Sequence, residues 1–324
     1  MRNKIKILSV FLLATLLLVA CSPNKGVNED ANAGTGKVPA IKKEEMLDLS
    51  KLTAKAVFMD VALERNNAMR GFGVDSKNQE FYISQTYYNL PSDLMINKVE
   101  LQDEAWVATE WMHAYESGYG GLSVEKDANG NIGLWMESNG TLEDIGTTIS
   151  YVNWENEGFI QREYGQTFRF ASSEGSYLSP QIDKENDWLV LRVTDKNGSR
   201  YDFYDKSSLL DGEEPKCIYS VKCKAGQKAT AGKDDSKGRY GTVTLRGFTV
   251  GGGYIYQLHG NAQGKIFVAV FDLEGNLAYC HMVKEYGDLA YRAPEALAYE
   301  DGKLYLLLTT GESGDRLASV LAFE

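Results

Sequence analysis

The sequence predicts one all-β domain, a β-propeller of five four-stranded blades whose ring is closed by an N-terminal strand. Three observations support this prediction. β-branched and aromatic residues stand in short alternating runs, and the 19 Tyr, 32 Gly and only 6 Pro are typical of strands joined by turns. A strand-turn-strand unit recurs along the chain. A strand candidate near the N-terminus is available to complete the last blade.

The first twenty residues have the parts of a bacterial lipoprotein signal peptide. Residues 1–6 carry three positive charges, residues 7–20 are almost entirely apolar, and the small residue Ala20 precedes Cys21. This apolar run of 14 residues is shorter than a membrane-spanning helix, which needs about 20. We expect cleavage before Cys21, lipidation of its thiol, and anchoring on the outer face of the bacterial cytoplasmic membrane. An uncleaved anchor or an ordinary secretory signal is the alternative.

Residues 21–43 are expected to form a flexible tether, because they are rich in Asn, Gly, Ala and Lys and lack apolar periodicity. The propeller is assigned to residues 44–324, and helix is expected only near Lys42 to Lys55. Removal of the signal peptide lowers the formal charge from -11 to -14. This charge argues against nucleic acid and against unspecific attraction to anionic lipid or wall polymer. The predicted contact with the membrane is therefore through the N-terminal lipid only.

The repeated unit consists of an alternating strand, a turn and a second apolar strand. The first copy reads Arg70-Gly-Phe-Gly-Val-Asp and then Phe81-Tyr-Ile-Ser-Gln. The five copies begin at Arg70, Gly120, Leu178, Arg246 and Glu295, with spacings of 50, 58, 68 and 49 residues. These spacings suit four-stranded blades with loops of different length. A β-sandwich or jelly roll has a compatible length, but the repeat does not favour it.

Further strand candidates lie between the copies and would form the outer half of each blade. They are Met95–Leu101, Thr148–Trp154, Ser199–Tyr204, Cys217–Lys224 and Phe267–Phe271. The fifth copy leaves room for only one more strand, Leu317–Phe323. Because an open edge would favour aggregation, we expect Ala56–Leu63 to pair there and close the ring.

Three segments resemble a known propeller family: Arg70–Gln85, Gly118–Ser138 and Pro294–Ala298. Over roughly residues 55–324 the chain is similar to the propeller of staphylococcal phage receptor-binding proteins and teichoic acid biosynthesis protein C, with the bacteriocin helveticin J more distant. The resemblance implies recognition of a cell-surface glycopolymer. The chain departs from the family pattern at Arg70 and Arg246, where Gln is usual before Gly-Phe, and at Tyr119, where His is usual between two glycines.

The innermost strand of each blade lines the central channel, so the starts of the five copies should meet around one ring. We therefore expect Arg70, Tyr119, Arg246 and Glu295 to form a ligand site at the channel mouth. Arginine forks suit phosphate or carboxylate, and a facing glutamate can orient them or accept sugar hydroxyls. The alternative is a structural cluster whose charges neutralise one another.

A second candidate is an aromatic platform, because Trp111, His113 and Tyr115 alternate onto one face of a strand. Aromatic rings bury the apolar face of a sugar without needing a charge. Filling of the wedge between two blades is the alternative role.

No metal or cofactor is expected. Asp127 to Asn131 copies the opening of a calcium loop, but the glutamate expected at position twelve is missing and a hairpin turn demands the same residues. No catalytic motif is present, and the predicted function is non-catalytic binding of a glycan or wall polymer. A carbohydrate-active hydrolase or lyase remains the alternative, with Glu125, Asp183 and Glu295 as the first carboxylates to consider. A lipoprotein that only docks a partner is a third.

Overall fold

The computed structural model describes residues 37–38, 41, 46–87, 90–118, 121–127, 129–140, 147–160, 165–170, 177–195, 198–224, 244–284, 289, 291–311 and 315–324. The predicted signal peptide and Cys21 lie outside these residues. Of the predicted tether, Val38 and Ile41 are described, and both pack against the apolar cluster between the third and fourth blades. No helix in these ranges is long and apolar enough to cross a membrane.

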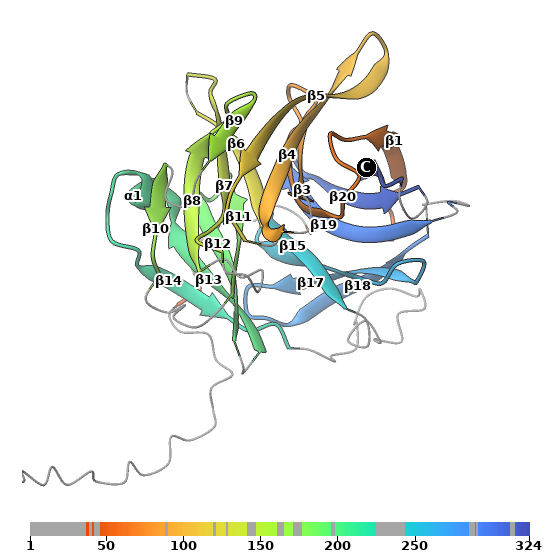
Figure 1. Ribbon diagram of the computed structural model, residues 1–324. Helices are drawn as coiled ribbons and strands as arrows, with labels where there is room; N and C mark the ends of the chain where they lie inside the picture. Colours follow the sequence, from red (N-terminus) through yellow and green to blue (C-terminus); the bar gives the residue numbers. More distant parts are fainter. Residues whose placement is uncertain are drawn as a thin grey trace, which may run out of the picture. The chain divides into compact units, whose positions relative to one another are not determined.

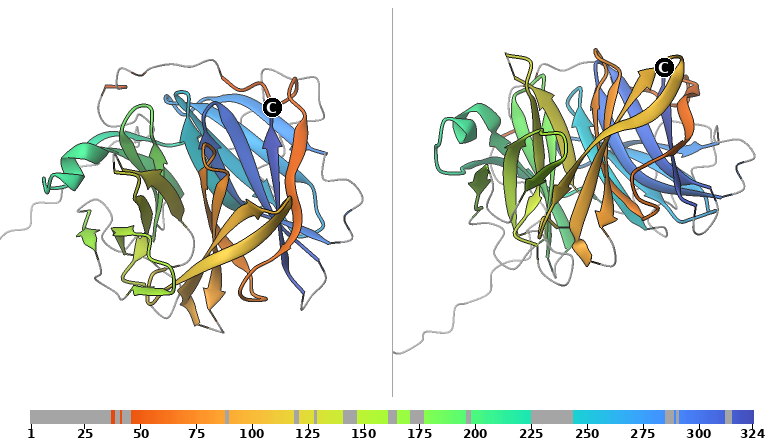
Figure 2. Two further views of the ribbon diagram at one scale, coloured as in Figure 1. Left: turned by 90° about the horizontal axis from the view of Figure 1, so that it is seen from above. Right: turned by 45° about the horizontal axis from the view of Figure 1, so that its top comes forward.

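The described strands form five sheets, one for each blade (Figures 1 and 2). The first holds β2 (Met69–Asp75), β3 (Glu80–Tyr87), β4 (Leu90–Gln102) and β5 (Ala105–Ala114), and β9 (Gly158–Ile160) pairs parallel to β5. The second holds β6 (Leu122–Lys126), β7 (Ile132–Ser138), β8 (Thr148–Asn153) and β10 (Gln166–Phe168). The third holds β11 (Tyr177–Asp183), β12 (Trp188–Asp195), β13 (Gly198–Asp205) and β14 (Cys217–Val221). The fourth holds β15 (Leu245–Gly251), β16 (Tyr254–Gly260), β17 (Ile266–Asp272) and β18 (Leu277–Val283). The fifth holds β19 (Arg292–Glu300), β20 (Lys303–Thr310), β21 (Leu317–Phe323) and β1 (Ala54–Ala62).

The five innermost strands contact one another in a closed ring. β2 contacts β6, β6 contacts β11, β11 contacts β15, β15 contacts β19, and β19 returns to β2. Apart from the parallel β9, all strand pairs within the blades are antiparallel. The predicted propeller of five four-stranded blades is therefore confirmed.

The ring is closed by β1, as predicted, although the strand covers Ala54–Ala62 rather than Ala56–Leu63. It pairs antiparallel with β21, from Ala54 opposite Phe323 to Ala62 opposite Leu317. In Figure 1, β1 (orange-brown) lies beside the blue strands of the C-terminal blade. The N-terminal strand thus covers the edge that the last blade would otherwise leave open.

The core consists of apolar layers between neighbouring blades, and β20 shows why its sequence is apolar at nearly every position. Leu304, Leu306 and Leu308 pack in the cluster shared with the fourth blade. Tyr305 and Leu307 pack in the cluster shared with the first blade. Successive side chains of a strand point to opposite faces. A strand buried on both faces is therefore a continuous apolar run.

Close approach of the innermost strands requires residues without side chains. A Cβ atom added to Gly73 would lie 2.4 Å from Cγ2 of Val124, and one added to Gly121 would lie 2.1 Å from Cδ of Pro180. Real Cβ atoms do not come this near to neighbouring carbons. The Gly-rich starts of the first two repeat copies therefore permit the tight ring at the propeller axis.

The helix expected near Lys42 to Lys55 is a wrong prediction for the described part of that stretch, residues 46–55, which holds turns and the start of β1. Leu49 explains its apolar character, because this side chain is completely buried in the cluster between the fourth and fifth blades. Among the described residues, the helix is α1 (Lys206–Leu210). Asp205 caps it by accepting a hydrogen bond from the backbone N–H of Ser208.

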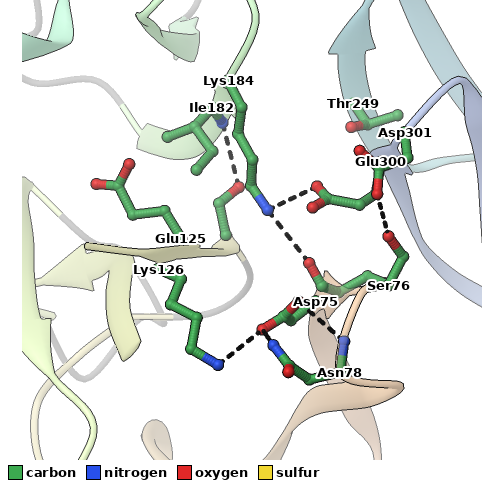
Figure 3. A network of polar contacts seen from close by, with 12 residues as sticks. Asp75, Ser76, Asn78, Glu125, Lys126, Ile182, Lys184, Thr249, Glu300 and Asp301 are labelled. Atoms are coloured by element: carbon green, nitrogen blue, oxygen red, sulfur yellow. Dashed lines mark hydrogen bonds and ion pairs between the residues drawn. The ribbon is translucent and has the colours of Figure 1, made fainter. Parts of the chain in front are cut away.

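Charged side chains from several blades form a network of polar contacts at the end where the innermost strands finish (Figure 3). Lys184 Nζ lies 2.6 Å from Oε2 of Glu300 and donates to the carbonyl oxygen of Val74 at 3.3 Å, so it links three blades. Beside it, Lys126 Nζ lies 3.5 Å from Oδ2 of Asp75. Burial raises the pKa of Glu300, and the Lys184 charge opposes this shift.

Replacing Lys184 with Met is expected to lower the free energy of unfolding by about 1–3 kcal/mol, because it leaves the buried Glu300 carboxylate without its cation. The Glu300 pKa, already raised, will rise further, so the folded state will hold this proton more tightly than the unfolded state. Stability is then lost as pH rises. Urea unfolding should show a larger loss at pH 8 than at pH 5. Lys303→Met, which breaks the exposed pair with Glu324, is the control and should change stability much less.

Candidate functional site

A cavity of about 450 Å³ opens at the end of the channel where the innermost strands begin. All five blades contribute to its wall through residues at or next to the start of these strands. These residues are Arg70, Gly121, Leu178, Arg246 and Glu295. Of the residues predicted for a ligand site at the channel mouth, Arg70, Arg246 and Glu295 line this one cavity. Tyr119 and Gly120 lie outside the described residues.

β-bulges position the three charged residues. The pairing of β15 with β16 shifts register between Leu245 and Gly247, so Arg246 is an extra residue with no partner in the ladder. β19 has the same kind of shift around Glu295, between Pro294 and Ala296. The pairing of β2 with β3 also shifts, across Arg70 and Gly71. A bulge bends the strand and redirects a side chain, so these charges reach the cavity while both neighbouring stretches stay paired.

Three arginines line the cavity from three blades: Arg70, Arg192 and Arg246. Nε of Arg246 donates to the carbonyl oxygen of Gly260 at 2.9 Å, which fixes the guanidinium, and its terminal nitrogens have no hydrogen-bond partner among the described residues. Arg192 lies over the ring of Phe248, with 5.9 Å between its Cζ and the ring centroid. Its Nε is buried and makes no hydrogen bond to any of the residues that the structure describes. The site thus holds forked donors that suit an anion.

Glu295 is the carboxylate between these arginines. It accepts a hydrogen bond from Thr309 Oγ1 at 2.8 Å. Its remaining exposed surface faces the cavity. Burial raises the pKa of Glu295 from its ordinary 4.5 to about 7, against the opposing effects of the Thr309 hydrogen bond and of the Arg70 and Arg246 charges. Near neutral pH a large fraction of the molecules therefore carries no negative charge here.

Sequence reasoning missed four further residues of the cavity wall. Arg192 and Glu137 lie on second strands, and Glu137 accepts a hydrogen bond from the backbone N–H of Gly121 at 2.8 Å. Tyr177 is 50 % exposed and presents an aromatic ring. Gln181 is buried and bridges neighbouring strands, accepting from Ser123 Oγ at 3.0 Å and from Thr249 Oγ1 at 3.4 Å.

Gln181 lines both this cavity and a smaller one beyond it, and the Lys184 contacts lie further along the channel. The two small cavities found there, lined in part by Lys184 and Glu300, have volumes of about 50 and 10 Å³. The free space along the channel thus narrows sharply beyond the 450 Å³ cavity.

Two of the three carboxylates considered for catalysis have structural roles away from the pocket. Glu125 forms an ion pair with Lys206 and accepts a hydrogen bond from Trp135 Nε1 at 2.7 Å. Asp183 accepts hydrogen bonds from the backbone and side chain of Asn186 in the turn after β11. Of the three, Glu295 alone lines the pocket.

The predicted aromatic platform does not lie at the channel. Trp111 and His113 are on β5, the fourth strand of the first blade, and Tyr115 follows that strand. His113 packs between Tyr87 and Tyr115, with 3.9 Å between the ring centroids in each pair. Phe159 on β9, which sequence analysis missed, joins this group.

The turn that begins at Asp127 supplies hydrogen-bond donors to the Asp127 carboxylate. Both oxygens of Asp127 accept hydrogen bonds, from the backbone N–H groups of Asn129 and Asn131 and from the Asn131 side chain. Within the described part of the chain, no three Asp, Glu, His or Cys side chains gather closely enough to hold a metal ion.

Comparison with known proteins places the fold but no family. No protein family model matches the chain, and no curated protein matches it in sequence. Among solved structures, a tail fibre of Staphylococcus aureus phage P68 aligns with a TM-score of 0.68 and 18% identity, over 86% of this chain and 54% of that one. The chain thus spans about half the length of the tail fibre.

Two glycoside hydrolases align less closely. An exo-β-1,3-galactanase from Phanerochaete chrysosporium has a TM-score of 0.45 and 10% identity, over 83% of this chain and 63% of that one. An exo-1,5-α-L-arabinanase from a bovine ruminal metagenomic library has a TM-score of 0.40 and 13% identity, over 81% and 94%. The chain accordingly has a five-bladed propeller fold, similar to part of a phage tail fibre.

Proposed function

We propose that this chain is a lipid-anchored surface protein whose propeller binds an anionic cell-wall or extracellular glycopolymer without changing it. The observation that carries the proposal is the set of three arginines that three different blades direct into one pocket. The whole chain has a formal charge of -11. A local group of forked cations in such a chain attracts an anion only at that place.

The size and rim of the pocket support a sugar as the carrier of that anion. A volume of about 450 Å³ is within the range of pockets for small ligands. The half-exposed ring of Tyr177 can cover the apolar face of a sugar while the arginines hold its charged substituent. Because the cavities beyond the pocket are small, we expect a polymer to present a terminal unit or a side group to it and not to thread through the ring.

The sequence resemblance to phage receptor-binding proteins supports a glycopolymer as the ligand class. The direct test is calorimetric titration of the full chain, purified in detergent, with an anionic wall polymer and with a neutral polysaccharide of similar length. We expect saturable binding of the anionic polymer that weakens as salt concentration rises. Equal binding of both polymers, or binding of neither, contradicts the proposal.

Anchoring through Cys21 is tested separately. Cys21→Ala is expected to abolish incorporation of labelled fatty acid and to prevent normal processing of the signal peptide. Membrane fractionation and the size of the product report both effects. Cys280→Ala, at a buried cysteine of the fourth blade, is the control and should leave labelling unchanged.

A hydrolase is the second candidate, and one observation favours it. Glu137 and Glu295 line the same pocket, and the pKa of Glu295, raised to about 7, is that of a group able to donate a proton near neutral pH. Incubation with the polymer would then release new reducing ends, and Glu295→Gln would stop this release while retaining binding. If no ends appear after prolonged incubation, binding alone is the function.

A further inference from the structure

Five ring-bearing side chains form a connected group at the outer edge of the first blade. The aromatic edge, as we call it, consists of Tyr87, Trp111, His113, Tyr115 and Phe159. The rings of Tyr115 and Phe159 are nearly parallel, at 21°, with 6.3 Å between their centroids. Trp111 meets Phe159 edge-on at 6.1 Å. Phe159 is 57 % exposed and Tyr115 is 39 % exposed.

These rings do not fill the wedge between blades. Trp106 of the same strand and Trp154 after β8 pack against the inter-blade clusters, whereas Trp111, Tyr115 and Phe159 belong to none of the clusters among the described residues. Their burial is therefore not what holds the ring together. Exposed aromatic rings gathered in one place are typical of a binding surface.

β9 presents Phe159 at this surface. This short strand lies in the chain between β8 and β10 of the second blade but pairs with the first blade, parallel to β5, with Phe159 opposite His113. Gly158 and Ile160 are buried, and Phe159 between them points outward. Exposure of the Phe159 ring to water has an unfavourable free energy, because apolar surface stays hydrated. A ligand that covers the ring removes this surface from water and is stabilised by doing so.

The surface is suited to an uncharged ligand. Burial lowers the pKa of His113, so its imidazole is neutral at pH 7. The cation beside the group, Arg65, lies over the ring of Tyr87, with 5.1 Å between its Cζ and the ring centroid, and is engaged there. In contrast to the arginine pocket, the half-buried ring of Trp111 and the exposed rings of Tyr115 and Phe159 therefore offer apolar faces and no anion site.

One row of paired residues connects the aromatic edge with the pocket. Met69, a residue of the pocket wall, pairs with Gln85, which pairs with Met95. Met95 pairs with His113, and His113 pairs with Phe159. Four strand spacings separate the two ends of this row, which is about 19 Å. An extended glycan several sugars long can span this distance.

We infer that Trp111, Tyr115 and Phe159 form a second binding site, which takes an uncharged sugar ring of a glycan chain by stacking on its apolar face. The site goes beyond the proposed arginine pocket and uses no residue of it. Because one row of the first blade runs from Met69 in the pocket wall to Phe159, a long polymer can engage both sites together, and the second contact is then intramolecular.

The experiment titrates the full chain in detergent with N-acetylglucosamine and with methyl glucosides, and follows tryptophan fluorescence, which Trp111 reports. We expect saturation at millimolar sugar, on the order of 1–10 mM. Phe159→Ala should weaken this binding about tenfold, since one stacked aromatic contact accounts for such a factor. Ile218→Ala, which removes an exposed apolar side chain of the third blade, should not change it.

Arg246→Ala separates the two sites, because it should weaken binding of the anionic polymer and leave the neutral sugars unaffected. The inference is overturned if the sugars give no saturable signal, or if Phe159→Ala leaves their binding unchanged. It is also overturned if the rings instead join two copies of the chain. In that case sedimentation would show a dimer that Phe159→Ala dissociates, with no response to sugar.

Discussion

Arg246→Ala is expected to weaken binding of the anionic polymer by about a hundredfold. Removing one partner of a desolvated charged hydrogen bond costs about 2–5 kcal/mol, and 1.4 kcal/mol is a factor of ten. We choose Arg246 for this test because its Nε donates a hydrogen bond to the carbonyl oxygen of Gly260, so the guanidinium is fixed before the ligand binds. Calorimetric titration of the wild type and the variant measures the loss.

Two further variants make this result specific. Arg246→Lys keeps the charge but loses the fork, and an intermediate loss is expected because a lysine cannot bind an oxyanion through two parallel hydrogen bonds. Arg200→Ala removes an arginine of β13 that is paired with Asp202 outside the pocket, and it should bind like the wild type. If Arg246→Ala and Arg200→Ala lose affinity equally, general charge and not the pocket accounts for binding.

Binding of a phosphodiester polymer should strengthen about tenfold when pH falls from 8 to 6, a range over which such a polymer keeps its charge. The pKa of Glu295 is raised to about 7, so the carboxylate loses its negative charge in this range and ceases to compete for the arginines. By linkage, the bound anion raises this pKa further. Titrations at several pH values report the change.

Glu295→Gln imitates the protonated form at every pH. It should bind at pH 8 as tightly as the wild type binds at pH 6, and its pH dependence should be nearly flat. Glu213→Gln, at an exposed site after α1, should keep the wild-type dependence. A raised pKa also means that the folded state holds the Glu295 proton more tightly, so its contribution to stability falls as pH rises from 4.5 to about 7. Tighter binding at pH 8 than at pH 6 contradicts this role of Glu295.

The architecture was predictable because the sequence pattern of a blade lies within one short stretch of the chain. Each copy needs an alternating strand, a turn and a second strand that is buried on both faces. The continuous apolar run from Leu304 to Leu308 is an example of such a second strand. Closure by the N-terminal strand followed from counting strands in the last copy. The helix prediction failed because the apolar side chains of this stretch, such as Leu49, pack on the ring from an irregular segment and not from a helix.

The residues of the pocket were predictable only where they stand at equivalent positions of the sequence repeat. Arg70, Arg246 and Glu295 occupy equivalent repeat positions, so their meeting followed from symmetry. Arg192 faces Ser179 across a strand pair, and Glu137 reaches the backbone of Gly121. Such partners depend on register and on the bulges, which leave no distinct mark in one sequence. Phe159 was missed for the same reason. It lies on β9, which pairs with the first blade, whereas β8 and β10, its neighbours in the chain, belong to the second blade.

The closing strand also determines how the molecule would carry a load. The pocket lies where β19 begins, whereas β1 starts at Ala54 beside Phe323, at the opposite end of the ring. If the chain is held at its N-terminus, as proposed, a pull on a ligand in the pocket is resisted by the contacts of Val38, Ile41 and Leu49 with the ring and by the hydrogen bonds between β1 and β21.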